Sequence, residues 1–245
     1  MSETLSLHAV HHLYDKRLAQ STKPFRARGA TVPRCKYCMV NSHLCICAHR
    51  PVVESNAAFM LVMYDDEVLK PSNSGRLIAD VFDECFAFIW SRTNPDPDML
   101  AVLGDERYQP YVIFPEEYAP ERVATEITLE SGKKPLFILL DGSWNEAKKM
   151  FRKSPYLNQF PLLSIQPEQA SRFTLRESAK DNQLATAEVA ARIVDLFGES
   201  ANAQTLDLWF DVFREHYLTG KKQRTLPIPG ALDRLAAHLN ATETQ

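Results

Sequence analysis

Four cysteines lie close together in the first fifth of the chain and offer one kind of chemistry. Their spacing is Cys35-x2-Cys38-x6-Cys45-x-Cys47. Four thiolates can enclose Zn2+ tetrahedrally, with Zn–S bonds of about 2.3 Å. Because four protein ligands leave no position open for a substrate, the spacing predicts a structural metal site. Zinc is favoured over an iron–sulfur cluster, which is the competing interpretation.

The segment around these cysteines, residues 21–50, holds few aliphatic side chains. A bound metal would replace the hydrophobic core that such a segment lacks. His43 or His49 could stand in for one thiolate. The fifth cysteine, Cys85, lies in an apolar run and is expected to be buried in the core.

A second candidate for chemistry is the tetrapeptide Asp141-Gly-Ser-Trp144, which follows the apolar run 136–140 directly. In open parallel α/β sheets, ligands bind beyond the carboxyl ends of the strands. An aspartate there can act as a base or bind a substrate amine. Gly142 permits close backbone approach, and Ser143 can begin a helix whose amides face an anion. By position alone, an ordinary turn, helix cap and core tryptophan explain the segment equally well.

A long polar loop, residues 63–76, follows the first strongly apolar run. Its end, Ser72-Asn-Ser-Gly75, opens a predicted helix and would suit an anion, although a solvated loop with a helix cap is an equal alternative. Glu188, near the start of a later helix, could serve only to interact with the helix dipole.

The elements that must position these residues alternate along the chain. The predicted strands are residues 57–63, 85–90, 111–114, 136–140 and 161–165; the predicted helices between them are residues 75–82, 98–103, 120–129 and 145–152. The apolar runs are mostly continuous, as in strands buried on both faces. This order predicts an α/β fold with a mostly parallel sheet flanked by helices.

Helical patterns also occupy both ends of the chain, at residues 5–20, 186–197 and 206–218. We therefore expect residues 1–52 to form a helix and a small cysteine module, and residues 53–245 to form the α/β domain.

The bulk composition sets limits on function. The chain has 245 residues, 45% of them hydrophobic, and a net charge of −3. Since no global positive charge is present, nucleic-acid binding would need local basic clusters. No apolar run reaches the roughly 18 residues that span a bilayer, and no secretory signal is apparent. We expect a cytoplasmic protein that does not bind membranes.

Together these segments resemble the DTW-domain family, and in particular its bacterial tRNA-uridine aminocarboxypropyltransferases. The resemblance spans nearly the whole chain: the cysteine module, the turn Asn73-Ser-Gly-Arg76, the name-giving motif as Asp141-Gly-Ser-Trp144, and the helix start Thr186-Ala-Glu188. Ser143 stands where the family usually has threonine. The loop Tyr64-Asp-Asp-Glu67 replaces the frequent His-Pro-x-Glu.

The resemblance implies a SPOUT-like fold with a C-terminal knot and S-adenosylmethionine as co-substrate. It implies transfer of the 3-amino-3-carboxypropyl group to N3 of a uridine in tRNA. Asp141 is then the candidate general base, or it binds the α-amino group of S-adenosylmethionine. The candidate residues around S-adenosylmethionine are Met63, Asn73, Ser74, Gly75, Arg76, Leu140, Gly142, Ser143, Trp144, Thr186 and Glu188.

A tRNA partner requires focused positive charge in a net-negative chain. The candidate RNA-binding residues form three clusters: Arg26, Arg28 and Lys36; Lys148 and Arg152; and Lys221, Lys222 and Arg224. Each cluster alone could be a solvated face, but three together favour RNA. A monomer is only slightly favoured over an oligomer.

Two other functions compete with this hypothesis. The chain could be a SPOUT-like RNA methyltransferase that transfers the methyl group of S-adenosylmethionine. It could also be a zinc-dependent RNA-binding adaptor without catalysis, which predicts no binding of S-adenosylmethionine.

Overall fold

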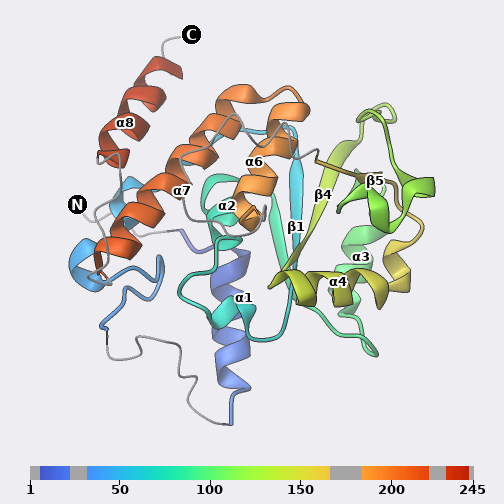
Figure 1. Cartoon of the computed structure of the whole chain (residues 1–245), viewed down its shortest axis with the longest axis horizontal. Coiled ribbons are helices and arrows are strands. Elements are labelled where there is room, and N and C mark those ends of the chain that lie inside the picture. The colour runs from blue at the N-terminus through green and yellow to red at the C-terminus, as the bar shows by residue number, and fades with distance from the viewer. Residues whose placement is uncertain (1–5, 23–31, 166–183, 221–229, 243–245) are drawn as a thin grey trace.

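The fold is a layered α/β arrangement, seen in a computed structural model that describes residues 6–22, 32–165, 184–220 and 230–242 (Figure 1). The strands are β1 (Ala58–Met63), β2 (Cys85–Ile89), β3 (Tyr108–Ile113), β4 (Lys134–Asp141) and β5 (Leu162–Leu163). The helices are α1 (Ala9–Ala19), α2 (Arg76–Val81), α3 (Pro97–Leu103), α4 (Trp144–Arg152), α6 (Thr186–Leu196), α7 (Ser200–Gly220) and α8 (Ala231–Thr242).

These strands form one five-stranded sheet in the order β2-β1-β4-β3-β5. Every neighbouring pair is parallel, so the predicted parallel sheet is confirmed. β1 and β4 are central and consist almost entirely of buried residues, as continuous apolar runs predict. In their register Met63 lies opposite Asp141, which brings the ends of both strands to one edge of the sheet.

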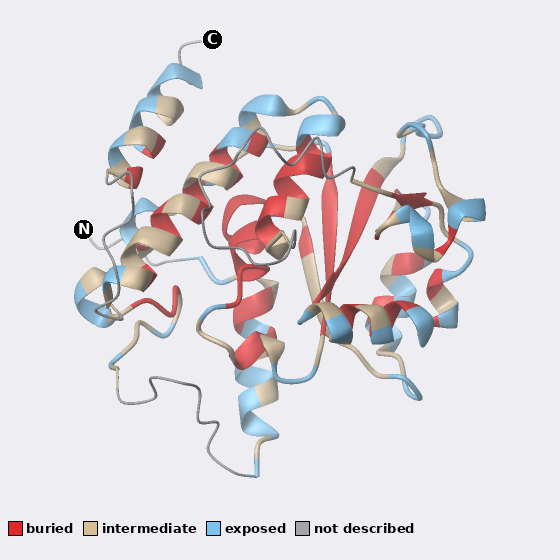
Figure 2. Ribbon diagram, in the orientation of Figure 1, coloured by how far each residue is buried: buried red, intermediate tan, exposed pale blue. Residues whose placement is uncertain are grey.

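Helices cover both faces of the sheet. Alternate residues of β1 point to opposite faces, since Phe59, Leu61 and Met63 belong to one core cluster and Ala58, Met60 and Val62 to another. The first cluster includes side chains of α1, α2, α6 and α7, and the second includes side chains of α3 and α4. Figure 2 shows the buried strands between these helical layers.

One predicted helix is wrong. Residues 120–129 contain a single 3-10 turn, Pro120–Arg122, and then run beside the sheet. Val123 forms a parallel bridge to Leu162, and the Ala124 amide donates to the Leu162 carbonyl at 2.8 Å. The edge of the short strand β5 that faces away from β3 offers these hydrogen bonds, and that tertiary pairing overrides the local helical pattern.

The cysteine module folds against the main core. It contains two short 3-10 turns, Ser42–Leu44 and Cys47–His49. Val40 and Ile46 are fully buried in the cluster that also contains side chains of α1 and α7. The module therefore shares hydrophobic contacts with the α/β part of the chain in addition to its cysteine cluster.

The C-terminal part of the fold contains more helix than the sequence predicted. Helix α8 was not expected from the sequence, and α7 is longer than its predicted range. The chain between β5 and α6 includes residues 166–183, so the path that would make a knot lies outside the described residues. Among the helices of the described ranges, none has the length and apolar character needed to cross a membrane.

Candidate functional site

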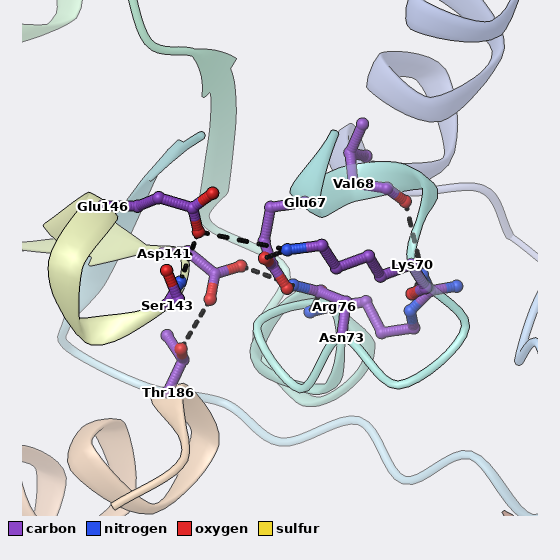
Figure 3. Close-up of polar contacts among 9 residues, drawn as sticks. All are labelled: Glu67, Val68, Lys70, Asn73, Arg76, Asp141, Ser143, Glu146 and Thr186. Carbon is purple, nitrogen blue, oxygen red and sulfur yellow. Dashed lines mark hydrogen bonds and ion pairs between the residues drawn. The ribbon is translucent and has the colours of Figure 1, made fainter. Parts of the chain in front are cut away.

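The carboxyl edge of the sheet brings together three segments that are far apart in the sequence. Asp141 ends β4, Asn73 lies in the loop before α2, and Thr186 begins α6. The Asp141 carboxylate accepts hydrogen bonds from Asn73 Nδ2 at 2.6 Å and from Thr186 Oγ1 at 2.5 Å. Figure 3 shows Asp141 between these two donors. All three had been singled out in the sequence.

Asp141 is buried, and its carboxyl group is a weaker acid than that of an ordinary aspartate. Burial, with the nearby charge of Glu67, raises the pKa of Asp141 to about 6, although hydrogen bonds from Thr186 and Asn73 and the charge of Arg76 act in the opposite direction. A carboxylate with a pKa near neutrality can take up a proton under physiological conditions. This is the protonation behaviour that a general base requires.

Glu67 is a second carboxylate in the site, and it was not predicted from the sequence. The Asn73 amide nitrogen also donates to Glu67 Oε1 at 3.2 Å, so one amide bridges two acidic groups. Lys70 Nζ binds Glu67 Oε2 at 2.6 Å and lies 3.9 Å from Glu146 Oε2 (Figure 3). Lys70 therefore offsets the negative charge of Glu67 and Glu146.

Gly75 packs directly against the Asp141 carboxylate. A Cβ atom at this position would lie 2.4 Å from Asp141 Oδ2, far inside van der Waals contact. The backbone of Gly75 has ordinary right-handed helical angles. Glycine is required here by space, and not by backbone conformation.

The guanidinium group of Arg76 supports the loop around the site. It is buried and donates to the carbonyls of Val68 and Lys70 at 3.4 and 3.2 Å, and to the Tyr37 carbonyl at 3.4 Å. Figure 3 shows it turned toward Val68 and Lys70. Arg76 thus ties the loop before α2 to the cysteine module.

The turn after Asp141 is compact. The Ser143 amide donates to Glu146 Oε2 at 2.7 Å, which closes the first turn of α4, while the Ser143 side chain is exposed. A Cβ on Gly142 would lie 3.1 Å from Glu146 Cβ and 3.2 Å from Tyr64 Cβ. The backbone at Gly142 therefore has little room for a side chain.

Trp144 lies on the opposite face of the sheet from the Asp141 carboxylate. Its half-buried ring stacks on Phe114 with centroids 5.5 Å apart and meets the edge of Tyr118 at 5.9 Å. Lys148 Nζ lies 5.7 Å from the Trp144 ring. The tryptophan joins the core cluster of α4 and keeps one part of its ring accessible.

The other predicted residues around the site are mostly buried supports. Met63 and Leu140 lie in the strands below it, and Ser74 is buried in the loop before α2. The Glu188 carboxylate accepts a hydrogen bond from the Ala185 amide at 2.7 Å. This contact fixes the first turn of α6, from which Thr186 reaches Asp141.

The four clustered cysteines are placed to hold a metal ion. The Sγ atoms of Cys35 and Cys47 are 3.6 Å apart, and those of Cys38 and Cys45 are 3.9 Å apart. A tetrahedron with Zn–S bonds of about 2.3 Å has edges of about 3.8 Å, so the group fits zinc. The ligand atoms of all four lie within 4.8 Å of one another.

The sequence also offered His43 or His49 as a substitute ligand and placed Cys85 in the core. The group of close ligand atoms around the thiols comprises the four cysteines and contains neither His43 nor His49. Cys85 is buried in β2, as expected of a core residue.

The predicted RNA-binding residues fall into described and undescribed parts of the chain. Lys36, Lys148 and Arg152 are described; Arg152 and Lys36 are exposed and Lys148 is half-buried. The remaining candidates, Arg26, Arg28, Lys221, Lys222 and Arg224, lie outside the described residues. Helix α4, which follows Asp141-Gly-Ser143 in the chain, thus carries basic side chains along its second half.

Comparison with known proteins identifies the family. A family model of the DTW domain matches residues 32–218. This match covers well over half of the chain and includes both the cysteine module and the Asp141 site. No solved structure matches the chain. Membership in this family is consistent with a tRNA-modifying role. The chain belongs to the DTW domain family.

Proposed function

We propose that the chain transfers the 3-amino-3-carboxypropyl group of S-adenosylmethionine to N3 of a uridine in tRNA. The observation that carries the proposal is the buried Asp141 carboxylate, with its pKa raised to about 6 and its orientation set by Asn73 and Thr186. Family membership supports a tRNA substrate. The cytoplasm is the compartment that suits this substrate.

The residues around Asp141 fit the amino-acid arm of S-adenosylmethionine. That arm has a sulfonium and an ammonium group, which complement the carboxylate of Glu67 and, in its alternative role, that of Asp141. Its carboxylate finds a complementary charge in Lys70. Because Gly75 and Gly142 have no side chains, their backbone atoms lie close to the site. When bound, S-adenosylmethionine supplies an electrophilic γ-carbon whose bond to sulfur breaks with release of methylthioadenosine.

Asp141 is the proposed general base. Its carboxylate accepts the N3 proton of the uridine, so that the nitrogen electron pair can form the new bond to carbon. Asn73 and Thr186 keep the carboxylate in one orientation, and burial together with the charge of Glu67 keeps its pKa high. In the alternative role Asp141 binds the α-amino group, and positioning alone selects the γ-carbon over the methyl group.

The four-cysteine module is proposed to hold zinc as a structural ion. Its thiolates supply all four ligands, so the metal fixes the fold of residues 34–50 and takes no part in the transfer. The Arg76 bond to the Tyr37 carbonyl connects this fold to the loop that carries Asn73.

The experiment that tests the function follows two differently labelled forms of S-adenosylmethionine. With label in the aminocarboxypropyl carbons, the tRNA should become labelled; with label in the methyl group, the label should leave in methylthioadenosine. Methyl label in the tRNA would instead indicate the methyltransferase alternative. Absence of S-adenosylmethionine binding by calorimetry would favour the RNA-binding adaptor.

Gly75→Ala is expected to reduce transfer by at least about tenfold, because the new methyl group displaces the Asp141 carboxylate. The measurement is kcat/KM for unmodified tRNA. Gly104→Ala is the matched control, since its Cβ would find no atom closer than 3.6 Å. Equal activity of the Gly75 and Gly104 variants would contradict the assigned role of the Asp141 position.

Arg152→Gln combined with Lys153→Gln is expected to weaken tRNA binding and reduce its salt dependence. Both residues are exposed at the end of α4, and each lost phosphate contact lowers the slope of log Kd against log salt by about 0.7–0.9. Lys133→Gln, near the opposite edge of the sheet, is the control. An unchanged slope in the double variant would exclude this surface from RNA binding.

A further inference from the structure

A pair of stacked aromatic rings stands at the carboxyl edge of the sheet and is not used by the proposed chemistry. Tyr64 follows β1 directly, and Trp90 follows β2. The Tyr64 amide donates to the Asp141 carbonyl and the Trp90 amide donates to the Met63 carbonyl, each at 2.8 Å. The two residues are therefore fixed by backbone hydrogen bonds to the strands that carry the site.

The geometry of this pair is well defined. The ring centroids of Tyr64 and Trp90 are 5.7 Å apart, with an angle of 19° between the ring planes. Lys149 Nζ lies 5.2 Å from the Tyr64 centroid and 5.7 Å from the Trp90 centroid, and it donates to the Tyr64 hydroxyl at 2.9 Å. Trp90 Nε1 donates to Oγ of the fully buried Ser154 at 2.8 Å.

These three side chains combine accessibility with positive charge. Both rings are half-buried and Lys149 is exposed. Strand β2 is at the border of the sheet, so the residue that follows it lies beside solvent. Aromatic rings accept stacked nucleobases, and a lysine ammonium binds phosphate or base oxygen atoms. Lys149 also belongs to α4, which carries the basic side chains described above.

The position of the pair determines which nucleotide it can receive. Tyr64 and Trp90 pack against the core cluster of α3 and α4, whereas Asn73 and Thr186 hold the Asp141 carboxylate on the side of α2 and α6. Gly142 follows Asp141 in the chain, and a Cβ on it would lie only 3.2 Å from Tyr64 Cβ, so the turn after Asp141 packs beside Tyr64. The pair is thus next to the reacting group but on the other face of the sheet.

We propose that Tyr64, Trp90 and Lys149 form a binding site for a nucleotide of tRNA that neighbours the reacting uridine. The neighbouring base stacks on the aromatic pair, and Lys149 contacts its phosphate or a base oxygen. This inference rests on the proposed function, because it assumes tRNA as the substrate. In this role the three side chains position the RNA and do not contact the reacting atoms.

The test compares variants of Tyr64 in binding to unmodified tRNA transcript and in binding to S-adenosylmethionine. Tyr64→Leu, which keeps apolar bulk without a ring, should raise the Kd for tRNA by about tenfold and leave the Kd for S-adenosylmethionine unchanged. Tyr64→Phe keeps the ring and should stay within about threefold of the wild type. Lys149→Gln should lower the slope of log Kd against log salt by about one.

Arg107→Gln is the matched control, since Arg107 lies 5.2 Å over the Tyr108 ring near the amino end of β3. It should leave tRNA binding unchanged. Wild-type affinity of Tyr64→Leu for tRNA, or equal weakening by Tyr64→Phe, would overturn the inference. If the wild type binds tRNA through these rings but transfers no group, the proposed function fails while this binding site stands. Melting temperatures identify a variant that is merely unfolded, in which case Tyr64→Met, which also keeps apolar bulk without a ring, provides the same comparison.

Discussion

Asp141→Asn is expected to lower the rate of group transfer by about 10²- to 10⁴-fold, the usual contribution of a positioned general base. The substitution changes little else. The new amide oxygen can accept from Asn73, and the new amide nitrogen can donate to the Thr186 hydroxyl, so both present contacts survive. Measurement of kcat and of the Kd for S-adenosylmethionine separates the two roles of Asp141. A general base affects kcat alone, whereas an amine ligand also affects that Kd.

The same substitution is expected to stabilise the folded protein at neutral and alkaline pH. The folded-state pKa of Asp141 is raised from 3.8 to about 6, so the wild type loses stability as pH rises between these values. Above pH 6 the full penalty applies, with an upper bound of about 3 kcal/mol. Below about pH 4 the wild type and the variant should be equally stable, because both side chains are then neutral.

Wild-type kcat/KM should also increase with pH, reach half its maximum near pH 6 and level off about one pH unit higher, as Asp141 loses its proton. Asp195→Asn serves as the control, because Asp195 is an exposed acid of the helix that carries Thr186. It should leave activity unchanged. Near-normal group transfer by Asp141→Asn would show that Asp141 takes no part in the reaction.

Loss of the metal is expected to have the largest effect on stability. Cys38→Ser should eliminate about one equivalent of zinc per chain and lower the melting temperature by at least about 10 °C, since each kcal/mol shifts Tm by about 2–4 °C in a chain of this size. The cause is loss of one of four ligands in a segment whose other anchors are few, such as the buried Val40 and Ile46. Elemental analysis and thermal denaturation measure both effects.

Cys85→Ser is the control for this prediction, because Cys85 is buried outside the cluster. It should keep its zinc, although its stability can fall. A wild-type protein with iron and visible absorption would indicate an iron–sulfur cluster. A protein without any metal, and with a melting temperature insensitive to chelators, would contradict a metal site altogether.

The fold was largely predictable because its core strands are continuous apolar runs. β1 and β4 coincide with predicted runs to within two residues at either end, and α2 and α4 begin where glycine and serine precede a helical pattern. The helix predicted over residues 120–129 was wrong because a neighbouring strand, far along the chain, offered hydrogen bonds. The sequence of residues 120–129 alone does not indicate such pairing.

The site was only partly predictable from the sequence. Asp141 could be selected because it follows a buried strand, but its bonds to Asn73 and Thr186 depend on how three distant segments meet. Glu67 and Lys70 were missed because charged residues in a polar loop are ordinarily solvated. Their role depends on Asn73, whose amide reaches both Glu67 and Asp141.

Mass spectrometry of nucleosides tests the central claim most directly. Unmodified tRNA is incubated with S-adenosylmethionine and the wild-type protein or Asp141→Asn, and then digested. The wild type is predicted to add about 101 Da to a uridine, the mass of the 3-amino-3-carboxypropyl group, and the variant to add almost none. A gain of about 14 Da would indicate methyl transfer, and unmodified uridine with the folded, zinc-loaded wild type would contradict the proposed activity.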